Sequence, residues 1–320
     1  MLTGPNTMIH VAAAAISDVQ GRVLVSKRPE HVHQGGLWEF PGGKLEQDES
    51  IEEALVRELR EELGIQLLHS EPLIRIRHAY GDRSVLLDFF RVTRYSGKVN
   101  GLEGQPLQWL YPTEMEPEKF PEADRPVITA LQLPERYLIT GDDVAQPSQF
   151  LQRLDTALEQ GIGIVQLRAH RLEDDAYRAL LLASLSRCHS MGAKLLINRP
   201  QGVVDWLGEA DGIHFTARQL MSCTRRPLNE GLQGASCHSL HELKQVERLG
   251  LDYALLSPVR PTASHPRVPC LGWERFAEWV DLVNLPVYAL GGMQPGMQPQ
   301  AKSYGAQGIA GISTFWSVNP

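Results

Sequence analysis

The sequence lacks the features that are typical of membrane proteins, secreted proteins and proteins that bind duplex DNA. No apolar run approaches the ~20 residues that a membrane-spanning helix requires, and the first residues lack the charged-then-apolar order of a signal peptide. Only four cysteines occur, all in the second half and without C-x-x-C spacing, which favours reduced thiols over a disulfide framework. Basic residues are in deficit, since the net charge is −7. We therefore expect a cytoplasmic protein that neither enters a membrane nor binds nucleic acid stably.

The acidic excess is concentrated in the first half. Residues 1–134 hold 20 acidic and 14 basic side chains, whereas the rest of the chain holds 18 and 17. Length 320 suggests two domains, and the segment Leu133-Pro134-Glu135-Arg136 has the composition of a linker. We predict one domain over residues 1–133 and a second over residues 134–320.

The first half mixes strands with one strong helix. Residues 9–15 and 22–27 flank a turn signal and are predicted to form a hairpin. Further strands are predicted at 74–78, 84–95 and 107–111, with a closing helix at 126–133. Strands, helix, strands and helix in that order are typical of an α+β sandwich.

The second half alternates short β runs with helical stretches such as 149–160 and 173–191. The pattern predicts a (β/α)8 barrel of the TIM type. Its eight strands are expected at 137–140, 164–168, 194–198, 212–215, 234–238, 253–257, 287–290 and 308–313.

The strongest signal is a Glu-rich helix in the first half. Ser50 is a good N-cap, Glu53 completes a capping box, and Gly64 supplies a C-terminal stop. Three leucines spaced four apart are expected to face the core: Leu55, Leu59 and Leu63.

Three carboxylates crowd one face of this helix. Glu58, Glu61 and Glu62 lie at i, i+3 and i+4, where like charges repel. A solvated surface is the ordinary explanation for a Glu-rich helix, but a hard divalent cation, Mg²⁺ or alternatively Mn²⁺, would turn the repulsion into binding energy. We predict Glu58 and Glu62 as ligands, with Glu61 shared.

Three residues near the carboxylates have predicted roles as well. Arg57 either orients an adjacent carboxylate or forms an exposed i,i+4 ion pair with Glu61. Gly42 and Gly43 allow backbone carbonyls to approach a metal, where a side chain would obstruct.

The spacing of this segment resembles the Nudix box, G-x5-E-x7-R-E-U-x-E-E-x-G-U, in which U is apolar. The residues that match it are Gly43, Glu49, Arg57, Glu58, Leu59, Glu61, Glu62, Gly64 and Ile65. Nudix hydrolases cleave nucleoside diphosphates linked to another moiety, so the resemblance implies a hydrolase.

Flanking segments narrow the resemblance to the MutT branch, which comprises 8-oxo-dGTP diphosphatases. They are residues 23–29, 37–44, 102–106 and 120–128. By this resemblance Arg28 and Arg83 contact substrate, Glu39 and Phe40 line the base pocket, and Glu103 lies near the metals. Phe40 is alternatively a plain core residue.

Asp124 departs from the MutT pattern, which has Asn at this pocket position. An ionised Asp only accepts hydrogen bonds, whereas Asn donates and accepts. Either burial keeps Asp124 protonated, so that it donates to a purine oxygen, or base preference has changed.

The resemblance implies that water attacks a nucleoside triphosphate in the presence of Mg²⁺, releasing the monophosphate and pyrophosphate. Glu58, Glu61, Glu62 and Glu103 are all candidates for the base that takes the proton.

Residues 136–315 resemble thiamine phosphate synthase and its relative TenI. Short motifs follow successive predicted strands, where the active sites of such barrels lie. The resemblance predicts a ligand site, for a phosphorylated thiazole or thiamine-like molecule, formed by Gln166, Arg168, Asn198, His238, Thr262, Gly291, Gly292 and Ser313.

The barrel departs from the synthase pattern at its metal site. Synthases have Asn-Asp where this chain has Asn198-Arg199, and a second acidic ligand is absent after the fourth strand. Expected lysines are replaced by His170 and His265. We therefore expect a phosphate-ligand-binding domain. His238 matches a TenI histidine proposed for acid–base work.

Three hypotheses remain open from the sequence. The first is an 8-oxo-dGTP pyrophosphohydrolase for nucleotide-pool sanitation and mutation avoidance, carrying a degenerate barrel. The second is a less selective Nudix enzyme that a thiamine intermediate regulates through the barrel. The third is a bifunctional enzyme that also makes thiamine phosphate.

Overall fold

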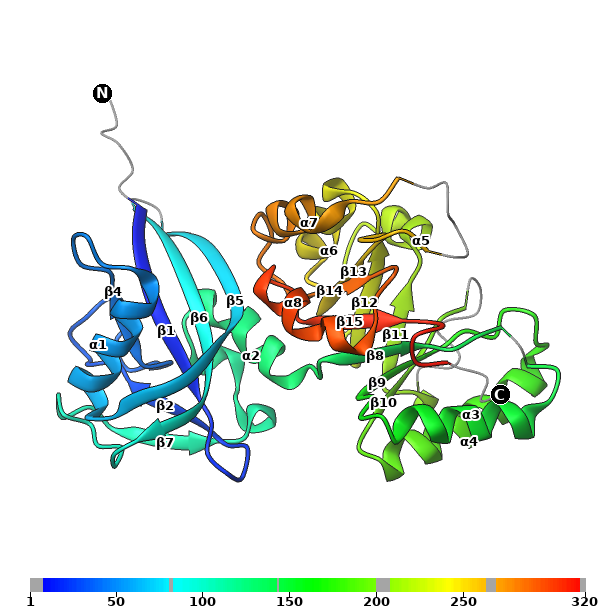
Figure 1. The fold of residues 1–320 in the computed structure, drawn as a ribbon, viewed down its shortest axis with the longest axis horizontal. Helices are drawn as coiled ribbons and strands as arrows, with labels where there is room; N and C mark the ends of the chain where they lie inside the picture. The colour runs from blue at the N-terminus through cyan, green and yellow to red at the C-terminus, as the bar shows by residue number, and fades with distance from the viewer. Residues whose placement is uncertain (1–7, 81–82, 143, 200–207, 263–268, 317–320) are drawn as a thin grey trace. The chain divides into compact units, whose positions relative to one another are not determined.

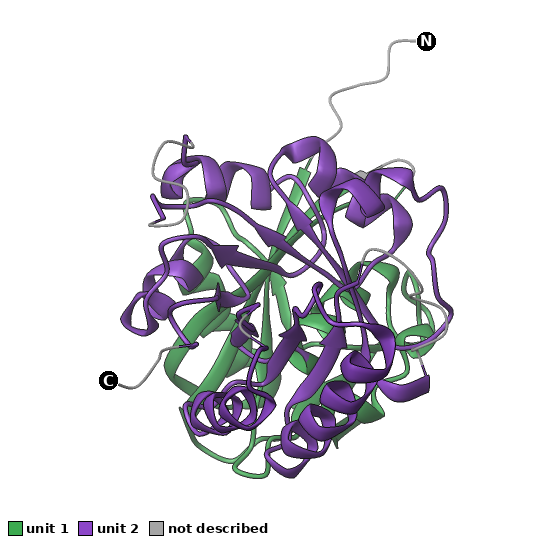
Figure 2. Ribbon diagram, turned by 90° about the vertical axis from the view of Figure 1, so that its right-hand side faces the viewer, with its two compact units in different colours: residues 1–132 green, residues 133–320 purple. Residues whose placement is uncertain are grey.

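The computed structural model describes residues 8–80, 83–142, 144–199, 208–262 and 269–316. Its contacts divide the chain into two compact units, Met1–Gln132 and Leu133–Pro320, which are coloured separately in Figure 2. Each unit has buried apolar clusters of its own, so each is described by itself.

The described part of the first unit contains two β-sheets and two α-helices. One sheet has the strand order β4-β1-β6-β5 and the other β3-β2-β7 (Figure 1). Three short 3₁₀ turns, η1 to η3, precede the second helix. The elements are β1 (Met8–Ile16), β2 (Val23–Lys27), β3 (Trp38–Glu39), β4 (Gly42–Lys44), α1 (Ile51–Leu63), β5 (Gln66–Tyr80), β6 (Arg83–Ser96), β7 (Leu107–Leu110), η1 (Pro112–Glu114), η2 (Pro117–Lys119), η3 (Glu122–Asp124) and α2 (Arg125–Gln132).

The larger sheet is buried on both faces. Along β1, Ala13 and Ala15 belong to the core under α2, whereas Ala12, Ala14 and Ile16 belong to the core under α1. Successive side chains of a strand point to opposite faces, so small residues on both faces allow a helix to pack closely on each side. The predicted α+β sandwich is confirmed.

Helix α1 has the ends that the sequence predicts. The Ser50 hydroxyl accepts the Glu53 N–H, the Glu53 carboxylate accepts the Ser50 N–H at 2.9 Å, and Gly64 adopts a left-handed φ of 68°. Its buried side chains are Ala54, Leu55, Leu59 and Leu63. The opposite face is left for the carboxylates.

The predicted hairpin of β1 and β2 is wrong. The two strands share only a single bridge, between Ser17 and Val23, and then enter different sheets. β1 instead pairs in parallel with β6 and antiparallel with β4. The turn at Asp18–Arg22 forms as expected, but tertiary packing of the alanine-rich β1 between two helices decides its partners.

The second unit is a closed barrel of eight parallel strands, in the order β10-β11-β12-β13-β14-β15-β8-β9. The predicted (β/α)8 fold is confirmed. Its strands are β8 (Arg136–Ile139), β9 (Ile164–Leu167), β10 (Lys194–Ile197), β11 (Gly212–Phe215), β12 (Leu232–Cys237), β13 (Tyr253–Leu256), β14 (Val287–Leu290) and β15 (Gly308–Gly311). Its helices include α3 (Pro147–Leu158), α4 (Asp174–Ser190), α5 (Ala217–Ser222), α6 (Leu240–Leu249), α7 (Gly272–Val280), α8 (Gln298–Ser303) and the 3₁₀ turn η5 (Pro295–Met297).

Large aromatic side chains fill the inside of the barrel. Tyr137, Tyr253 and Tyr288 are fully buried there with the aliphatic residues of alternate strands. Gly234 makes room for them, because a Cβ at this position would lie 2.1 Å from Cζ of Tyr253. The barrel interior is therefore a packed core, and any ligand site must lie at its mouth.

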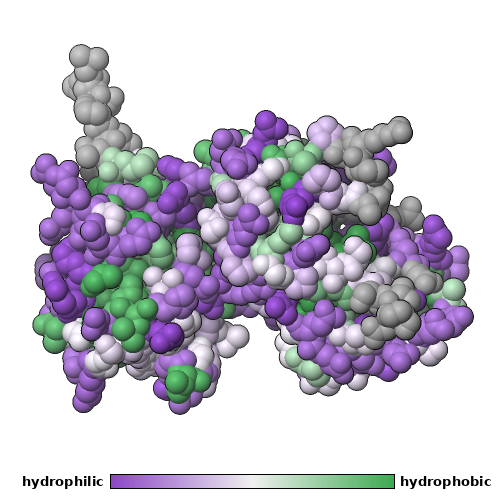
Figure 3. Space-filling view, in the orientation of Figure 1, coloured by the Kyte–Doolittle hydropathy of each residue, from purple (hydrophilic) through white to green (hydrophobic). Residues whose placement is uncertain are grey.

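The visible surface of both units is mainly hydrophilic, with smaller apolar areas (Figure 3). Across the described residues, we find no helix with both the length and the apolar character to cross a membrane.

Candidate active site and barrel mouth

Arg57 is the centre of an ion-pair network on the acidic face of α1. Its guanidinium donates to Glu49 at 2.9 Å, to Glu58 at 2.8 Å and to Glu61 at 3.3 Å, and it also donates to the Lys44 carbonyl at 3.0 Å. Both contacts that the sequence suggested for Arg57 therefore occur together. These hydrogen bonds raise the pKa of Arg57, and the bond to Glu49 has the largest effect. The Arg57 side chain also holds the Glu58 carboxylate against α1 and β4.

The two glycines of β4 lie directly on the carboxylates of α1. A Cβ at Gly43 would lie 2.1 Å from Oε1 of Glu58, and the Gly42 N–H donates to Oε2 of Glu62 at 3.1 Å. Gly42 is also required by its strand partner, since a Cβ there would lie 2.1 Å from the Ala12 carbonyl oxygen. Only glycine at both positions allows this approach.

Glu62 lies in a crowded, partly buried acidic environment. Burial is the largest cause that raises its pKa to about 8; the Gly42 N–H opposes this shift, and the charges of Glu58, Glu103 and Glu39 contribute to it. The loop that carries Glu103 is anchored to the end of α1, because the Glu62 carbonyl accepts the Leu102 N–H at 2.9 Å. This environment disfavours uncompensated negative charge.

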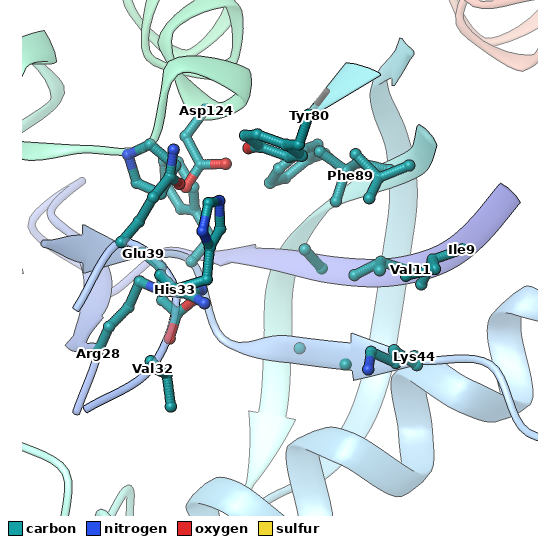
Figure 4. Close-up of a pocket in the computed structure, with 18 residues that line it drawn as sticks. Ile9, Val11, Arg28, Val32, His33, Glu39, Lys44, Tyr80, Phe89 and Asp124 are labelled. Carbon is teal, nitrogen blue, oxygen red and sulfur yellow. Dashed lines mark hydrogen bonds and ion pairs between the residues drawn. The ribbon is translucent and has the colours of Figure 1, made fainter. Parts of the chain in front are cut away.

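A cavity of about 360 Å³ adjoins this cluster (Figure 4). Predicted pocket residues from β3, the loop after β2 and η3 converge on it. It is lined by Ile9, Val11, Ala13, Arg28, Val32, His33, Gln34, Glu39, Phe40, Gly42, Gly43, Lys44, Tyr80, Val85, Leu87, Phe89, Pro121 and Asp124.

Arg28 and Glu39 form an ion pair at the edge of the cavity. Burial raises the pKa of Glu39, and Arg28 opposes that shift. Phe40 lines the cavity and is also a core residue: it is 4% exposed, and its ring is edge-on to Phe89 with 5.7 Å between centroids. The Arg83 side chain lies outside the described residues.

Asp124 lines the cavity and is 7% exposed. Burial raises its pKa to about 8; the charge of Glu39 adds to the shift and Arg28 reduces it. The Asp124 carboxyl is therefore mainly protonated at neutral pH, and it has a hydroxyl that donates as well as an oxygen that accepts.

The predicted barrel residues lie at or next to the carboxyl ends of their strands. Asn198, His238 and Arg168 directly follow β10, β12 and β9. Gln166, inside β9, is buried and accepts a hydrogen bond from the Tyr137 hydroxyl at 3.1 Å. Thr262 follows β13, and Ser313 is an exposed residue after β15. His265 lies outside the described residues.

Gly291 and Gly292 follow β14 with φ values of 96° and 68°. A Cβ at Gly291 would lie 2.9 Å from Cα of Pro258, and one at Gly292 would lie 2.7 Å from the Pro261 carbonyl oxygen. The pair therefore allows the loop after β13 to pack against the loop after β14.

Comparison with known proteins assigns both units. A NUDIX domain model matches residues 12–130, and a thiamine monophosphate synthase model matches residues 136–315. An 8-oxo-dGTP diphosphatase of Proteus vulgaris is 43% identical over 96 residues, which are 30% of this chain and 86% of that protein. The chain belongs to the Nudix family and to the thiamine monophosphate synthase family.

Two further relatives bear on the two units. A putative thiamine-phosphate synthase 2 of Aquifex aeolicus is 35% identical over 186 residues, covering 58% of this chain and 99% of that protein. A CTP pyrophosphohydrolase of Escherichia coli is 41% identical over 123 residues, covering 38% of this chain and 90% of that protein. As a Nudix protein the chain is a hydrolase of phosphoanhydrides.

Three of the predicted metal ligands of the Nudix unit lie on the same face of α1, and each of these three already contacts another group. Glu58 and Glu61 contact Arg57, and Glu62 accepts the Gly42 N–H. No set of three or more His, Cys, Asp or Glu side chains is arranged to hold a metal ion among the described residues.

Sequence reasoning missed two aromatic residues of the Nudix pocket. His33, in the loop after β2, packs edge-on against Tyr80 at the end of β5, with 5.3 Å between ring centroids. Figure 4 shows both rings close to Asp124. No spacing in the sequence connects them, because 46 residues separate them and only the fold brings them together.

The barrel also contains a buried polar cluster that the sequence did not reveal. Nδ1 of His214 lies 3.0 Å from the Tyr253 hydroxyl, and Nε2 lies 2.9 Å from Oγ of Ser236. Burial lowers the pKa of His214 to about 3, so the ring is neutral. His214 therefore provides a hydrogen-bond partner for the Tyr137 and Tyr253 hydroxyls of the packed interior.

Proposed function

We propose that the Nudix unit is a Mg²⁺-dependent nucleoside triphosphate pyrophosphohydrolase that converts 8-oxo-dGTP to 8-oxo-dGMP and pyrophosphate. The observation that carries the proposal is the contact of Gly42 and Gly43 with the carboxylates of Glu62 and Glu58, next to a cavity of about 360 Å³. Two relatives of this unit are named 8-oxo-dGTP diphosphatase, at 43% and 35% identity.

The residues at this site fit a hard divalent cation. Carboxylate and backbone carbonyl oxygens are the ligands that Mg²⁺ prefers, and a Cβ at Gly43 would fill the space beside Glu58. Glu58 and Glu62 would hold the ion, with contributions from Glu61, Glu103 and the Gly42 carbonyl. When bound, Mg²⁺ neutralises the phosphate oxygens and so favours attack by water.

The protein's own groups account for the rest of the reaction. Arg57 orients the Glu58 carboxylate, and Arg28, which lines the cavity, contacts the substrate. Water adds to phosphorus, the bond between the α- and β-phosphates breaks, and one glutamate of the cluster takes the water proton. The monophosphate and pyrophosphate are the products.

The base pocket supports an oxidised purine substrate through Asp124. A protonated Asp124 has a donor for a purine carbonyl and an acceptor for a ring N–H, which reproduces what an Asn offers. Phe40 and the apolar residues of β1 and β6 provide contact area for the base.

A second candidate substrate is CTP. An ionised Asp124 would accept from the exocyclic amine of cytosine, and a relative of this unit is named CTP pyrophosphohydrolase. Kinetics on a panel of 8-oxo-dGTP, dGTP, CTP and dCTP with Mg²⁺ separate the two. Strong preference for 8-oxo-dGTP over dGTP supports the first, and preference for cytosine nucleotides overturns it.

The role of such an enzyme is removal of oxidised nucleotides from the cytoplasmic pool, and hence mutation avoidance during DNA replication.

For the barrel we propose a ligand with a phosphate group, a thiazole phosphate or a thiamine-like phosphate. Added thiamine monophosphate is expected to leave hydrolysis rates unchanged. A change in rate would favour a thiamine-regulated Nudix enzyme instead.

A further inference from the structure

The loop that carries Glu103 is docked on the C-terminal end of helix α1. The last carbonyl groups of a helix have no partner within the helix, and in α1 this loop supplies partners for two of them. The Glu62 carbonyl accepts the Leu102 N–H at 2.9 Å. The Leu63 carbonyl accepts the Asn100 N–H at 3.1 Å. The loop backbone is therefore fixed to the same turn of α1 that presents the Glu62 carboxylate.

Glu103 itself is an exposed residue in a tight turn. The Gly104 N–H donates to the Gly101 carbonyl at 3.2 Å, which closes the turn, and Gly104 has a left-handed φ of 78°. A Cβ at Gly101 would lie 2.4 Å from the Gln105 carbonyl oxygen, so a side chain at that position would clash. The turn shapes the chain around Glu103, but its closing hydrogen bond leaves the Glu103 N–H to find another acceptor.

The half-buried Gln105 side chain supplies that acceptor and ties the turn to α1. Its Oε1 accepts the Glu103 N–H at 2.9 Å, and its Nε2 donates to the Glu62 carbonyl at 3.2 Å. One amide thus uses both its acceptor and its donor, each on the backbone of a predicted metal ligand. The two bonds also fix the orientation of the amide, since the flipped amide would place donor against donor and acceptor against acceptor.

The Glu103 carboxylate lies within electrostatic reach of the acidic cluster. Burial is the largest cause of the raised pKa of Glu62 and of Glu39, and the charge of Glu103 contributes to both shifts. Like charges repel, so a loop that nothing held would move Glu103 away from Glu62 whenever no cation is bound. The bridge through Gln105 opposes this repulsion.

We propose that Gln105 is a positioning residue for metal binding, because its side chain holds the Glu103 backbone against the end of α1 and so keeps the Glu103 carboxylate beside Glu62. In this role Gln105 acts through Glu103 and contacts neither metal nor substrate. The inference rests on the proposed function, since it concerns the Mg²⁺ site of the Nudix unit. Groups that support metal ligands typically contribute about 10- to 100-fold to metal affinity.

The test is Gln105→Met in the full-length protein, a variant that keeps the length of the side chain and removes both hydrogen bonds. Calorimetry with Mg²⁺ and a non-hydrolysable nucleotide analogue should give a Kd for Mg²⁺ that is about tenfold weaker. In the metal-free protein, hydrogen exchange across residues 97–106 should become faster, because the Glu103 N–H loses its acceptor. An unchanged Kd for Mg²⁺, or unchanged exchange, would overturn the proposal.

A double-variant cycle tests whether Gln105 acts through Glu103. In a Glu103→Gln background, Gln105→Met should have little further effect on the Kd for Mg²⁺, because the carboxylate that Gln105 positions is absent. A full tenfold loss in that background would assign Gln105 a different role and overturn the proposal.

Gln132→Met is the matched control. The Gln132 side chain also donates to a backbone carbonyl, that of Pro112 at 2.7 Å, but it lies at the end of α2. The Kd for Mg²⁺ and the exchange of residues 97–106 should stay as in the wild type, and a tenfold loss in this control would contradict a specific role for Gln105. Absence of Mg²⁺ binding by the wild type would overturn the proposed function and this role together, whereas equal binding by the wild type and Gln105→Met would overturn this role alone.

Discussion

The two units resemble their families to a similar degree, but they differ in the acidic residues at the candidate sites. In the Nudix unit, Glu58 and Glu62 stand against two glycines that leave room for a cation. In the barrel, Arg199 stands where the synthase pattern has a carboxylate, although the eight-stranded fold is intact. Cores and close glycine contacts preserve a fold, whereas the chemistry depends on a few side chains at its edge.

The strongest test of this contrast is Glu62→Gln, which removes a charged oxygen from the Nudix cluster and leaves the barrel unchanged. Loss of a metal ligand removes several kcal/mol of transition-state stabilisation, so kcat should fall roughly a thousandfold. Steady-state hydrolysis of 8-oxo-dGTP measures it. Glu52→Gln, in the exposed first turn of the same helix, should retain nearly full activity. An active Glu62→Gln enzyme would show that Glu62 is not a ligand.

Gly43→Ala tests whether the space beside Glu58 is functional. The added Cβ meets the far end of a flexible carboxylate side chain, which can move at small cost to stability but leaves the metal site. We expect kcat to fall about a hundredfold with a nearly unchanged melting temperature. Gly296→Ala, where no atom lies within 4 Å of the new Cβ, is the control. A large loss of stability with normal specific activity would contradict this interpretation.

Arg57→Gln should have a smaller effect on hydrolysis. The variant loses the guanidinium that holds Glu58 and Glu49, and such supporting interactions typically contribute about 10- to 100-fold. Because the proposed Mg²⁺ ligands remain in this variant, a higher Mg²⁺ concentration should recover part of the rate. Initial rates measured over a range of Mg²⁺ concentrations test this prediction. A variant that behaves as the wild type at low Mg²⁺ would show that Arg57 forms ion pairs without supporting the site.

The smallest expected effect concerns base preference at Asp124. Its pKa is raised to about 8, above the value in an unfolded chain, so the proton is retained below pH 8 and lost above it. The ratio of kcat/KM for 8-oxo-dGTP to that for CTP should therefore fall as pH rises from about 7 to about 9, by roughly tenfold. Because the ratio compares two substrates at the same pH, the titration of groups that affect both substrates equally cancels. Asp124→Asn should make the ratio independent of pH; an equal fall in that variant would exclude Asp124.

Much of the fold was predictable because local signals agreed with tertiary packing. The strands 212–215 and 287–290 have the ends that the sequence predicts, and Ser50 and Gly64 cap the two ends of α1 as expected. Errors arose where packing overrode local pattern. β4 is glycine-rich and unlike a strand, yet it pairs with β1 because only glycine fits against Ala12. The first half of β5 was also missed, since its side chains are mostly exposed.

The candidate sites divide in the same way. Glu58, Glu61 and Glu62 are close in sequence, so helical spacing alone places them on one face. His33, Tyr80 and Asp124 come from three separate elements and meet only in the folded unit. The packing of Arg199 against Tyr177 depends on the contact of a β10 strand end with α4, which no local pattern predicts.

The central claim, that the acidic face of α1 holds Mg²⁺ against a triphosphate, is tested most directly by calorimetry with Mg²⁺ and a non-hydrolysable nucleotide analogue. The full-length protein should bind Mg²⁺ with the analogue present, and the Glu58→Gln, Glu62→Gln double variant should lose that binding. Equal Mg²⁺ binding by the two proteins, or none by the wild type, would contradict the account.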